Sequence, residues 1–175
     1  HTAYRRQRQM CIRDRCYAGK TTIGKLLSEK LHKRGIDSRD IFMSKFNMSE
    51  NEYLTKYGKT KFQQAEELSI SQDFGDSVIS LGGSAIYYTK QMRHILDNYT
   101  VIWLDAPFDV ILKRKSNENW ERPIVFPDGI ETFQDLYYQR KELYKKFHTI
   151  RIPIQETDSA NDVVDNIILR LKLTY

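Results

Sequence analysis

The sequence predicts an α/β fold in which a mainly parallel sheet is covered by helices on both faces. Short apolar runs at residues 78–81 and 101–104 alternate with segments of helical periodicity, and Gly or Pro follows each run. Continuous apolar runs are typical of strands that are buried on both faces. The 175 residues, 40% of them hydrophobic, suit one domain. We therefore expect a three-layer αβα domain whose ligands bind at the C-terminal ends of the strands.

The composition argues against several classes of protein. No window approaches 18 apolar residues, and no apolar segment follows the N-terminal arginines, so we expect no membrane partner, no secretory signal and a cytoplasmic location. The net charge of +5 is concentrated at one end, because residues 1–15 hold five arginines and one aspartate. That segment carries +4 and leaves +1 for residues 16–175, so no nucleic-acid partner is expected for the body of the chain.

Residues 1–16 show neither strand nor helix periodicity. Both cysteines, Cys11 and Cys16, lie here without a second pair or a nearby His, which is a poor zinc signal. Three interpretations stay open: a basic RNA-binding or transit-like arm, a native irregular start, or a non-native sequence such as translated adapter read-through. We favour a non-native or disordered segment, leave it out of the fold, and expect the first strand of the sheet to be lost or replaced. The domain then spans residues 17–175.

The remaining elements follow in order. A first helix starts at Lys20 and is closed by Arg34 and Gly35, and a short strand follows around Asp37. Residues 49–72 are mostly helical, with a break near Gly58. Ser84 is expected to cap the helix after the strand at 78–81. Beyond the strand at 101–104 we expect a helix at 108–115, a polar loop at 116–131, a helix at 133–147, a strand at 150–152 and a last helix that buries Val163, Val164, Ile167, Ile168 and Leu171.

The first helix opens on a phosphate-loop signature. Gly19, Lys20 and Thr21 match the second half of G-x-x-x-x-G-K-[ST], in which Lys reaches the β- and γ-phosphates and Thr offers a hydroxyl to Mg²⁺. The match is incomplete, because Asp14 stands where the first Gly belongs and Tyr17 where a Gly is usual in related loops. A solvated lysine at a helix start is the alternative.

Arg140 lies on the apolar stripe of its helix, with Leu136, Tyr137, Leu143 and Tyr144 three or four residues away. A guanidinium at a core position needs a carboxylate partner or an anionic ligand. We favour a ligand carboxylate or phosphate, for which the arginine fork is suited, over a structural ion pair.

Three further features could contact a ligand. Gly82 and Gly83 follow a buried strand and allow close backbone approach, although a plain tight turn is the alternative. Arg122 lies in the polar loop, which has the length of a lid, and could meet a transferring phosphoryl group. Arg114 could stack on a base.

Taken in order, the segments resemble the shikimate kinase family over residues 18–172: GKTTIGKLLSEKL, an Asp after the second strand, GKTKFQQAE, VISLGGSAI, VIWLDAP, ERPIV and RKELY. The resemblance implies a small P-loop kinase of the nucleoside-monophosphate-kinase type, with a five-stranded parallel sheet and a mobile lid at about 116–131. It also implies a monomer that transfers the γ-phosphoryl of ATP to the 3-hydroxyl of shikimate with Mg²⁺.

The resemblance further implies residue roles. Catalysis is expected from Lys20, Asp37 and Arg122. ATP is expected at Ala18, Gly19, Lys20, Thr21, Thr22, Arg114 and Arg122, and shikimate at Asp37, Asp40, Gly82, Gly83 and Arg140. Mg²⁺ is expected at Thr21 directly and at Asp37 through water.

Three substrate-side positions depart from the family pattern. Arg39 stands at the second Asp of D-x-D, which leaves Asp40 to serve if the strand slips by one residue. Gln63 replaces the second carboxylate-binding arginine, and Ser84 replaces the third glycine. The phosphate donor is therefore better supported than the acceptor. A sister kinase of another hydroxylated acid such as gluconate, a non-catalytic binding protein, and nucleic-acid binding through the arginine arm stay open.

Overall fold

The structure is a computed structural model that describes residues 9–13, 18–117 and 124–174. Its elements in chain order are β1 (Gln9–Arg13), α1 (Lys20–Lys30), β2 (Arg34–Asp37), α2 (Ser38–Phe46), α3 (Glu50–Ile70), β3 (Ser77–Ser80), the 3₁₀ helix η1 (Gly83–Tyr87), α4 (Thr89–Asn98), β4 (Tyr99–Asp105), α5 (Phe108–Ser116), α6 (Phe133–Lys146), β5 (Ile150–Pro153) and α7 (Ala160–Thr174). Within the described ranges, no helix is both long and apolar enough to cross a membrane.

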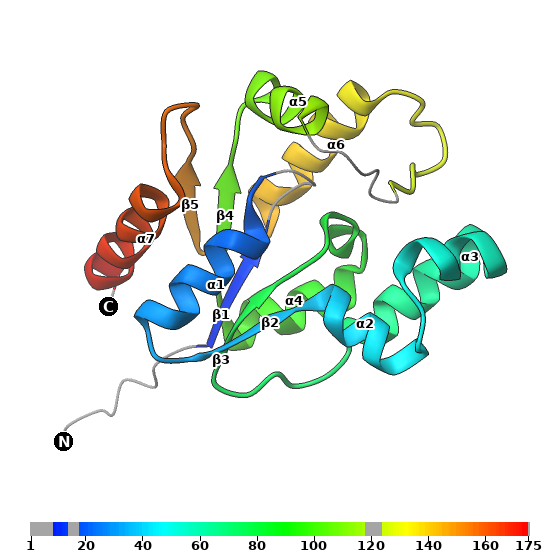
Figure 1. Cartoon of the computed structure of the whole chain (residues 1–175), viewed down its shortest axis with the longest axis horizontal. Coiled ribbons are helices and arrows are strands. Elements are labelled where there is room, and N and C mark those ends of the chain that lie inside the picture. Colours follow the sequence, from blue (N-terminus) through cyan, green and yellow to red (C-terminus); the bar gives the residue numbers. More distant parts are fainter. Residues whose placement is uncertain (1–8, 14–17, 118–123, 175) are drawn as a thin grey trace.

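The five strands form one parallel sheet in the order β2-β3-β1-β4-β5 (Figure 1). The expected α/β class and parallel sheet are confirmed. The first strand is not lost, because residues 9–13 form β1 at the centre of the sheet, and the alternative that a non-native sequence replaces it stays a prediction. Cys11 pairs with Ile79 on one side and with Val101 on the other. The apolar run Met10, Cys11 and Ile12 is only three residues long and lies among arginines. The hydrophobic pattern of the sequence therefore did not predict this strand.

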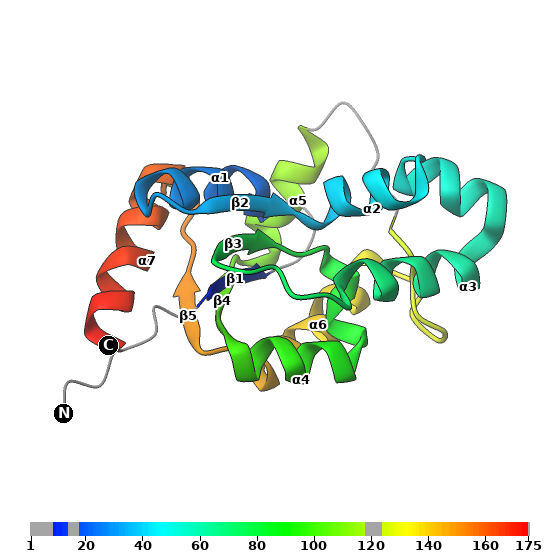
Figure 2. The same ribbon diagram turned by 90° about the horizontal axis from the view of Figure 1, so that it is seen from below.

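Alternation along β1 divides the core into two layers. Met10 and Ile12 pack with α1 and α7 residues, including Leu27 and Val164, on one face of the sheet. Cys11 is buried and faces the opposite layer with Met92 of α4. Figure 2 shows α1 and α7 on one side of the sheet and α4 and α6 on the other. This is the expected three-layer arrangement.

Helices α2 and α3 project beyond the sheet and have a small core of their own (Figure 2). Phe42 and Phe62 pack there with ring centroids 5.7 Å apart. The expected break near Gly58 is present, since Gly58 has a φ of 79° within α3. The sequence analysis missed α2, which begins directly after β2.

Two expected boundaries are corrected. The first helix ends at Lys30, while Arg34 and Gly35 belong to β2, so they do not close the helix. Ser84 does not cap α4, because η1 intervenes and the Ser84 hydroxyl donates to Glu66 Oε1 at 2.5 Å. The predicted buried positions Val163, Val164 and Ile167 are confirmed, and Ile168 and Leu171 pack partly buried against the same core.

Candidate active site

The phosphate-loop residues lie between the C-terminal edge of the sheet and the start of α1. Gly19 is the N-cap of α1 and has a left-handed φ of 87°, which favours glycine. The Lys20 side chain follows at the first helical position and is 8% exposed. The Lys20 carbonyl accepts a 3.0 Å hydrogen bond from the Ser80 hydroxyl at the end of β3. The loop is thereby fastened to the neighbouring strand, and the start of the helix offers an electropositive end to an anion.

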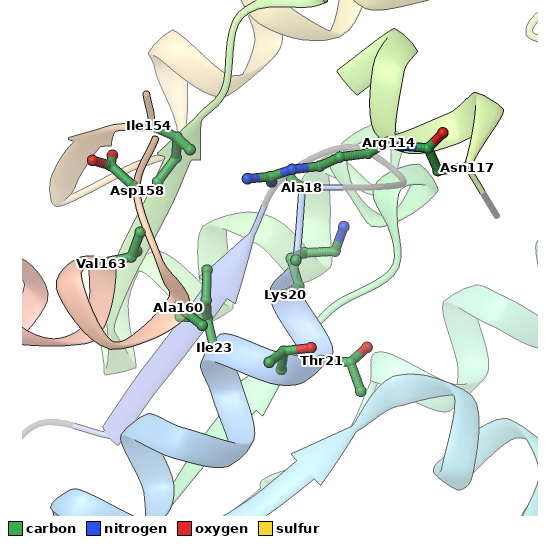
Figure 3. Close-up of a pocket in the computed structure, with 12 residues that line it drawn as sticks. Ala18, Lys20, Thr21, Ile23, Arg114, Asn117, Ile154, Asp158, Ala160 and Val163 are labelled. Atoms are coloured by element: carbon green, nitrogen blue, oxygen red, sulfur yellow. The ribbon is translucent and has the colours of Figure 1, made fainter. Parts of the chain in front are cut away.

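A cavity of about 400 Å³ opens beside this helix start. Figure 3 shows Lys20 pointing into it, while Arg114 extends from α5 across it. A Cβ placed on Gly19 would lie 3.9 Å from Arg114 Nη1, so this guanidinium leans over the phosphate loop. All five expected loop positions and Arg114 line the cavity, as Ala18, Gly19, Lys20, Thr21, Thr22 and Arg114.

The sequence analysis missed the opposite wall of this cavity. Ile154 and Asp158 follow β5, and Val163 lies in the first turns of α7 (Figure 3). The signal was present, because β5 ends at the same edge as the other strands. At one end of the cavity, Lys20 suits an anionic ligand, and at the other end Ile154 and Val163 are apolar. This division suits the phosphates and the base of a nucleotide.

Thr21, Asp37 and Arg39 form a closed set of hydrogen bonds at the end of β2. The Thr21 hydroxyl donates to Asp37 Oδ2 at 2.9 Å. Arg39 Nη2 donates to Thr21 Oγ1 at 2.8 Å and to Asp37 Oδ2 at 3.1 Å, and Arg39 Nε donates to Asp37 Oδ1 at 3.2 Å. Asp37 is also the N-cap of α2 and accepts from the backbone N–H of Arg39 at 3.0 Å. Burial by itself would raise the pKa of Asp37, but the hydrogen bonds and charge of Arg39 and the Thr21 hydroxyl outweigh it and lower that pKa.

The Thr21–Asp37 pair suits Mg²⁺ chemically. It offers a hydroxyl and a carboxylate, the hard oxygen ligands that this ion prefers. Among the described residues no group of three or more His, Cys, Asp and Glu side chains could hold a metal. Two protein oxygens beside a phosphate loop nonetheless match the usual behaviour of Mg²⁺, which keeps several waters and completes its shell with substrate phosphates.

A second, smaller pocket adjoins the first and shares Lys20 and Thr21 with it. Gly82, Gly83 and Arg140 line this pocket, as the sequence predicts. We call it the acceptor pocket. Lys20 and Arg140 thus lie on one cavity.

Arg140 is a core residue, 3% exposed. Its Nε donates to the Tyr87 hydroxyl at 3.2 Å, and its guanidinium carbon lies 5.3 Å from the centre of the Tyr87 ring. Tyr87 Oη in turn donates to Gln139 Oε1 at 2.7 Å. Tyr87 therefore helps to orient Arg140, whose charge also acts on the nearby Glu66 carboxylate, while its guanidinium lines the pocket.

Glu66 of α3 lies at the floor of the acceptor pocket and was missed as a site residue, although the quoted segment GKTKFQQAE ends on it. Its carboxylate accepts from the Ser84 hydroxyl at 2.5 Å and from the Tyr88 hydroxyl at 2.9 Å. Burial raises the pKa of Glu66, and the two hydroxyls and the charge of Arg140 only partly offset this. Glu66 therefore fixes the loop after β3 against α3.

The described part of the expected lid contacts the acceptor pocket. Ile124 and Val125 line it, and Val125 also packs against the α2–α3 core. Lys59 of α3 donates to Asp128 at 2.6 Å and ties the loop to that arm. Arg122, Asp14 and Tyr17 lie outside the described residues.

Some expected positions are not at the site. Asp40 is exposed in the first turn of α2 and lines neither pocket, so its expected contact with the acceptor stays a prediction that the position of this side chain does not support. The reason is that β2 ends at Asp37, paired with Ser80, and the chain turns at once into a helix that carries Asp40 away. Asp105, at the end of β4, pairs with Arg151 and lines neither pocket.

A phosphate loop and two adjoining cavities at the C-terminal edge of a five-stranded parallel sheet define a small P-loop kinase. Comparison with known proteins supports this class. The profile of the shikimate kinase family matches residues 17–172. The shikimate kinase of Bacillus pumilus is 30% identical over 175 residues, covering 97% of this chain and 92% of the relative. That of Persephonella marina is 31% identical over 157 residues, covering 89% of this chain and 93% of the relative. The chain belongs to the shikimate kinase family.

Solved structures agree on the fold. The structure of shikimate kinase from Acinetobacter baumannii in complex with shikimate has a TM-score of 0.80 and 23% sequence identity, covering 95% of this chain and 93% of that one. The structure from Bacteroides thetaiotaomicron has a TM-score of 0.78 at 23% identity, covering 94% and 98%. At this level of identity the likeness concerns the fold.

Proposed function

We propose that this protein is a shikimate kinase, which transfers the γ-phosphoryl group of ATP to the 3-hydroxyl of shikimate. The observation that carries the proposal is that Lys20 and Arg140, an ammonium and a guanidinium, line one pocket beside the larger cavity. One is suited to a polyphosphate and the other to the carboxylate of a small acid. Family membership supports the same reaction.

On the donor side, the backbone and ammonium of Lys20 hold the β- and γ-phosphates at the start of α1. Arg114 covers the nucleotide from α5, and Ile154 and Val163 receive the base. Thr21, directly, and Asp37, through water, would hold Mg²⁺, which would neutralise charge on the phosphates. Arg122 is proposed to reach the transferring group from the lid, which also excludes water.

On the acceptor side, Arg140 holds the carboxylate of shikimate and the backbone of Gly82 and Gly83 approaches its ring. Asp37 orients the attacking hydroxyl by accepting its hydrogen bond, because its lowered pKa keeps the carboxylate ionised. Little covalent chemistry is required from the protein, so these positions act by orientation and electrostatics. The proposal includes a monomer in the cytoplasm, with no nucleic-acid or membrane partner.

A coupled assay of ADP release tests the proposal. We expect turnover that requires shikimate, ATP and Mg²⁺ together, with a shikimate 3-phosphate product identified by mass spectrometry. Gluconate serves as the comparison acceptor. Turnover on gluconate but not on shikimate would refute the proposed acceptor and would identify a sister kinase.

A binding protein without turnover is the second candidate, and Arg39 is the observation that favours it. This arginine stands at an acceptor-side carboxylate position of the family and pairs with Asp37. Calorimetry that detects shikimate binding, without phosphoryl transfer in the coupled assay, would establish this candidate in place of the kinase.

A further inference from the structure

The side chain of Arg39 occupies the position at which the proposed metal would contact the protein. Its guanidinium donates to both groups of the Thr21–Asp37 pair, with Nη2 at 2.8 Å from Thr21 Oγ1 and 3.1 Å from Asp37 Oδ2. The Asp37 side chain is 15% and the Arg39 side chain 29% exposed, whereas Thr21 is exposed to solvent.

Charge repulsion at the Thr21 hydroxyl explains why this contact opposes the binding of a metal ion. The hydroxyl donates its single proton to Asp37 and accepts from Arg39, so its acceptor side already faces a cation. A Mg²⁺ ion on the same oxygen would lie about 2 Å from it, and hence within about 5 Å of the guanidinium. Two cations at that separation repel each other, and solvent at the exposed Thr21 screens part of this repulsion.

We propose that Arg39 is a resident cation at the Thr21–Asp37 pair, and that its guanidinium must leave this pair before Mg²⁺ carried by a nucleotide can take it. The inference rests on the metal use of the proposed function but does not depend on which acid is the acceptor. Arg39 and Glu50 both line the acceptor pocket, so the displaced guanidinium moves toward that pocket and stays near a carboxylate. Metal binding and the charge of the acceptor pocket are then coupled through one side chain.

The competition predicts that removing the guanidinium tightens metal binding. Mn²⁺ in the presence of ADP is the probe, because the loss of its free electron paramagnetic resonance signal measures binding without any turnover. Arg39→Met should lower the Kd of Mn²⁺ in the ADP complex by about tenfold, the size expected when one charge-assisted, partly exposed interaction no longer competes. The matched control is Arg34→Met, which removes an exposed arginine from the start of β2, the strand that ends at Asp37, and should leave the Kd unchanged.

A second measurement follows Arg39 itself. In ¹⁵N-labelled protein the Nε–H resonance of Arg39, assigned by its absence in Arg39→Met, should shift when Mg²⁺ and ADP are added together and much less with ADP alone. The inference would be overturned if the wild type and Arg39→Met bound Mn²⁺ with equal affinity. It would also be overturned if the Arg39 resonance did not shift when Mg²⁺ was added with ADP. Neither result would contradict the proposed kinase function. Failure of Mn²⁺ and ADP to bind any of the variants would overturn both. Absence of turnover on shikimate, with the Mn²⁺ difference present, would refute the proposed acceptor alone.

Discussion

Replacing Arg140 by methionine tests the acceptor pocket most directly. Arg140 is 3% exposed, so solvent screens its charge little, and the substitution keeps the length of the stem while removing the guanidinium. A hydrogen bond to a charged group contributes about 1.5–3 kcal/mol. That range corresponds to a rise of about 10- to 100-fold in the KM for shikimate. The KM for ATP should not change, because Arg140 does not line the nucleotide cavity.

The coupled ADP-release assay supplies both KM values, and calorimetry supplies the shikimate Kd. Lys141→Met is the matched control, since Lys141 is the next residue of α6 and lines neither pocket. Thermal unfolding must be measured alongside, because Glu66 loses a favourable countercharge when the guanidinium is removed. An unchanged shikimate KM in a folded Arg140→Met protein would refute the carboxylate assignment.

Three further predictions concern the residues around the two pockets. Burial raises the pKa of Glu66 above its ordinary value of 4.5, so the stability that Glu66 contributes is complete below pH 4.5 and is lost as the pH rises through the folded-state pKa. In urea unfolding, the wild type should therefore lose stability relative to Glu66→Gln above about pH 4.5. A stability difference that does not change with pH would contradict this. Gly24→Ala should cost about 1–3 kcal/mol in the free energy of unfolding, because the new Cβ would overlap Ser80 Oγ, and adding Ser80→Ala should recover part of the loss in a double-mutant cycle; no recovery would show that the clash lies elsewhere. Gln63→Arg restores the family's second carboxylate-binding arginine one helical turn before Glu66 and should lower the KM for shikimate by about tenfold, whereas an unchanged or raised KM would favour a different acceptor.

Much of the fold could be predicted because its signals are local. Residues 78–81 and 101–104 are short and mainly apolar, and residues 78–80 and 101–104 lie in buried strands. Strand β1 could not be found in this way. Met10, Cys11 and Ile12 form a run too short to show a period, and their burial follows from β3 and β4 on either side, which are distant in sequence.

The residues of the candidate site show the same contrast between local sequence signals and tertiary contacts. Lys20 and Arg140 could be predicted because each has an anomalous place in a helix pattern, one at a glycine-preceded start and the other on an apolar stripe. The sequence alone could not show that Asp40 lies outside both pockets, because the helix face on which it lies depends on where β2 ends and α2 begins. The contact of Arg39 with Thr21 joins two segments through tertiary structure, so no spacing reveals it.

The Ser80 hydroxyl, which fastens the phosphate loop to the strand that leads into Gly82 and Gly83, has a consequence for how catalysis is organised. Because this bond joins the start of α1 to the end of β3, we expect the separation of the proposed ATP and shikimate sites to be set before either ligand binds, which would leave little orientational freedom to lose during the reaction. The choice of acceptor acid would then depend on helices α2 and α3 and on the loop that the Lys59–Asp128 ion pair connects to them. Substitutions in those segments would then change which acid is bound without changing the geometry of phosphoryl transfer.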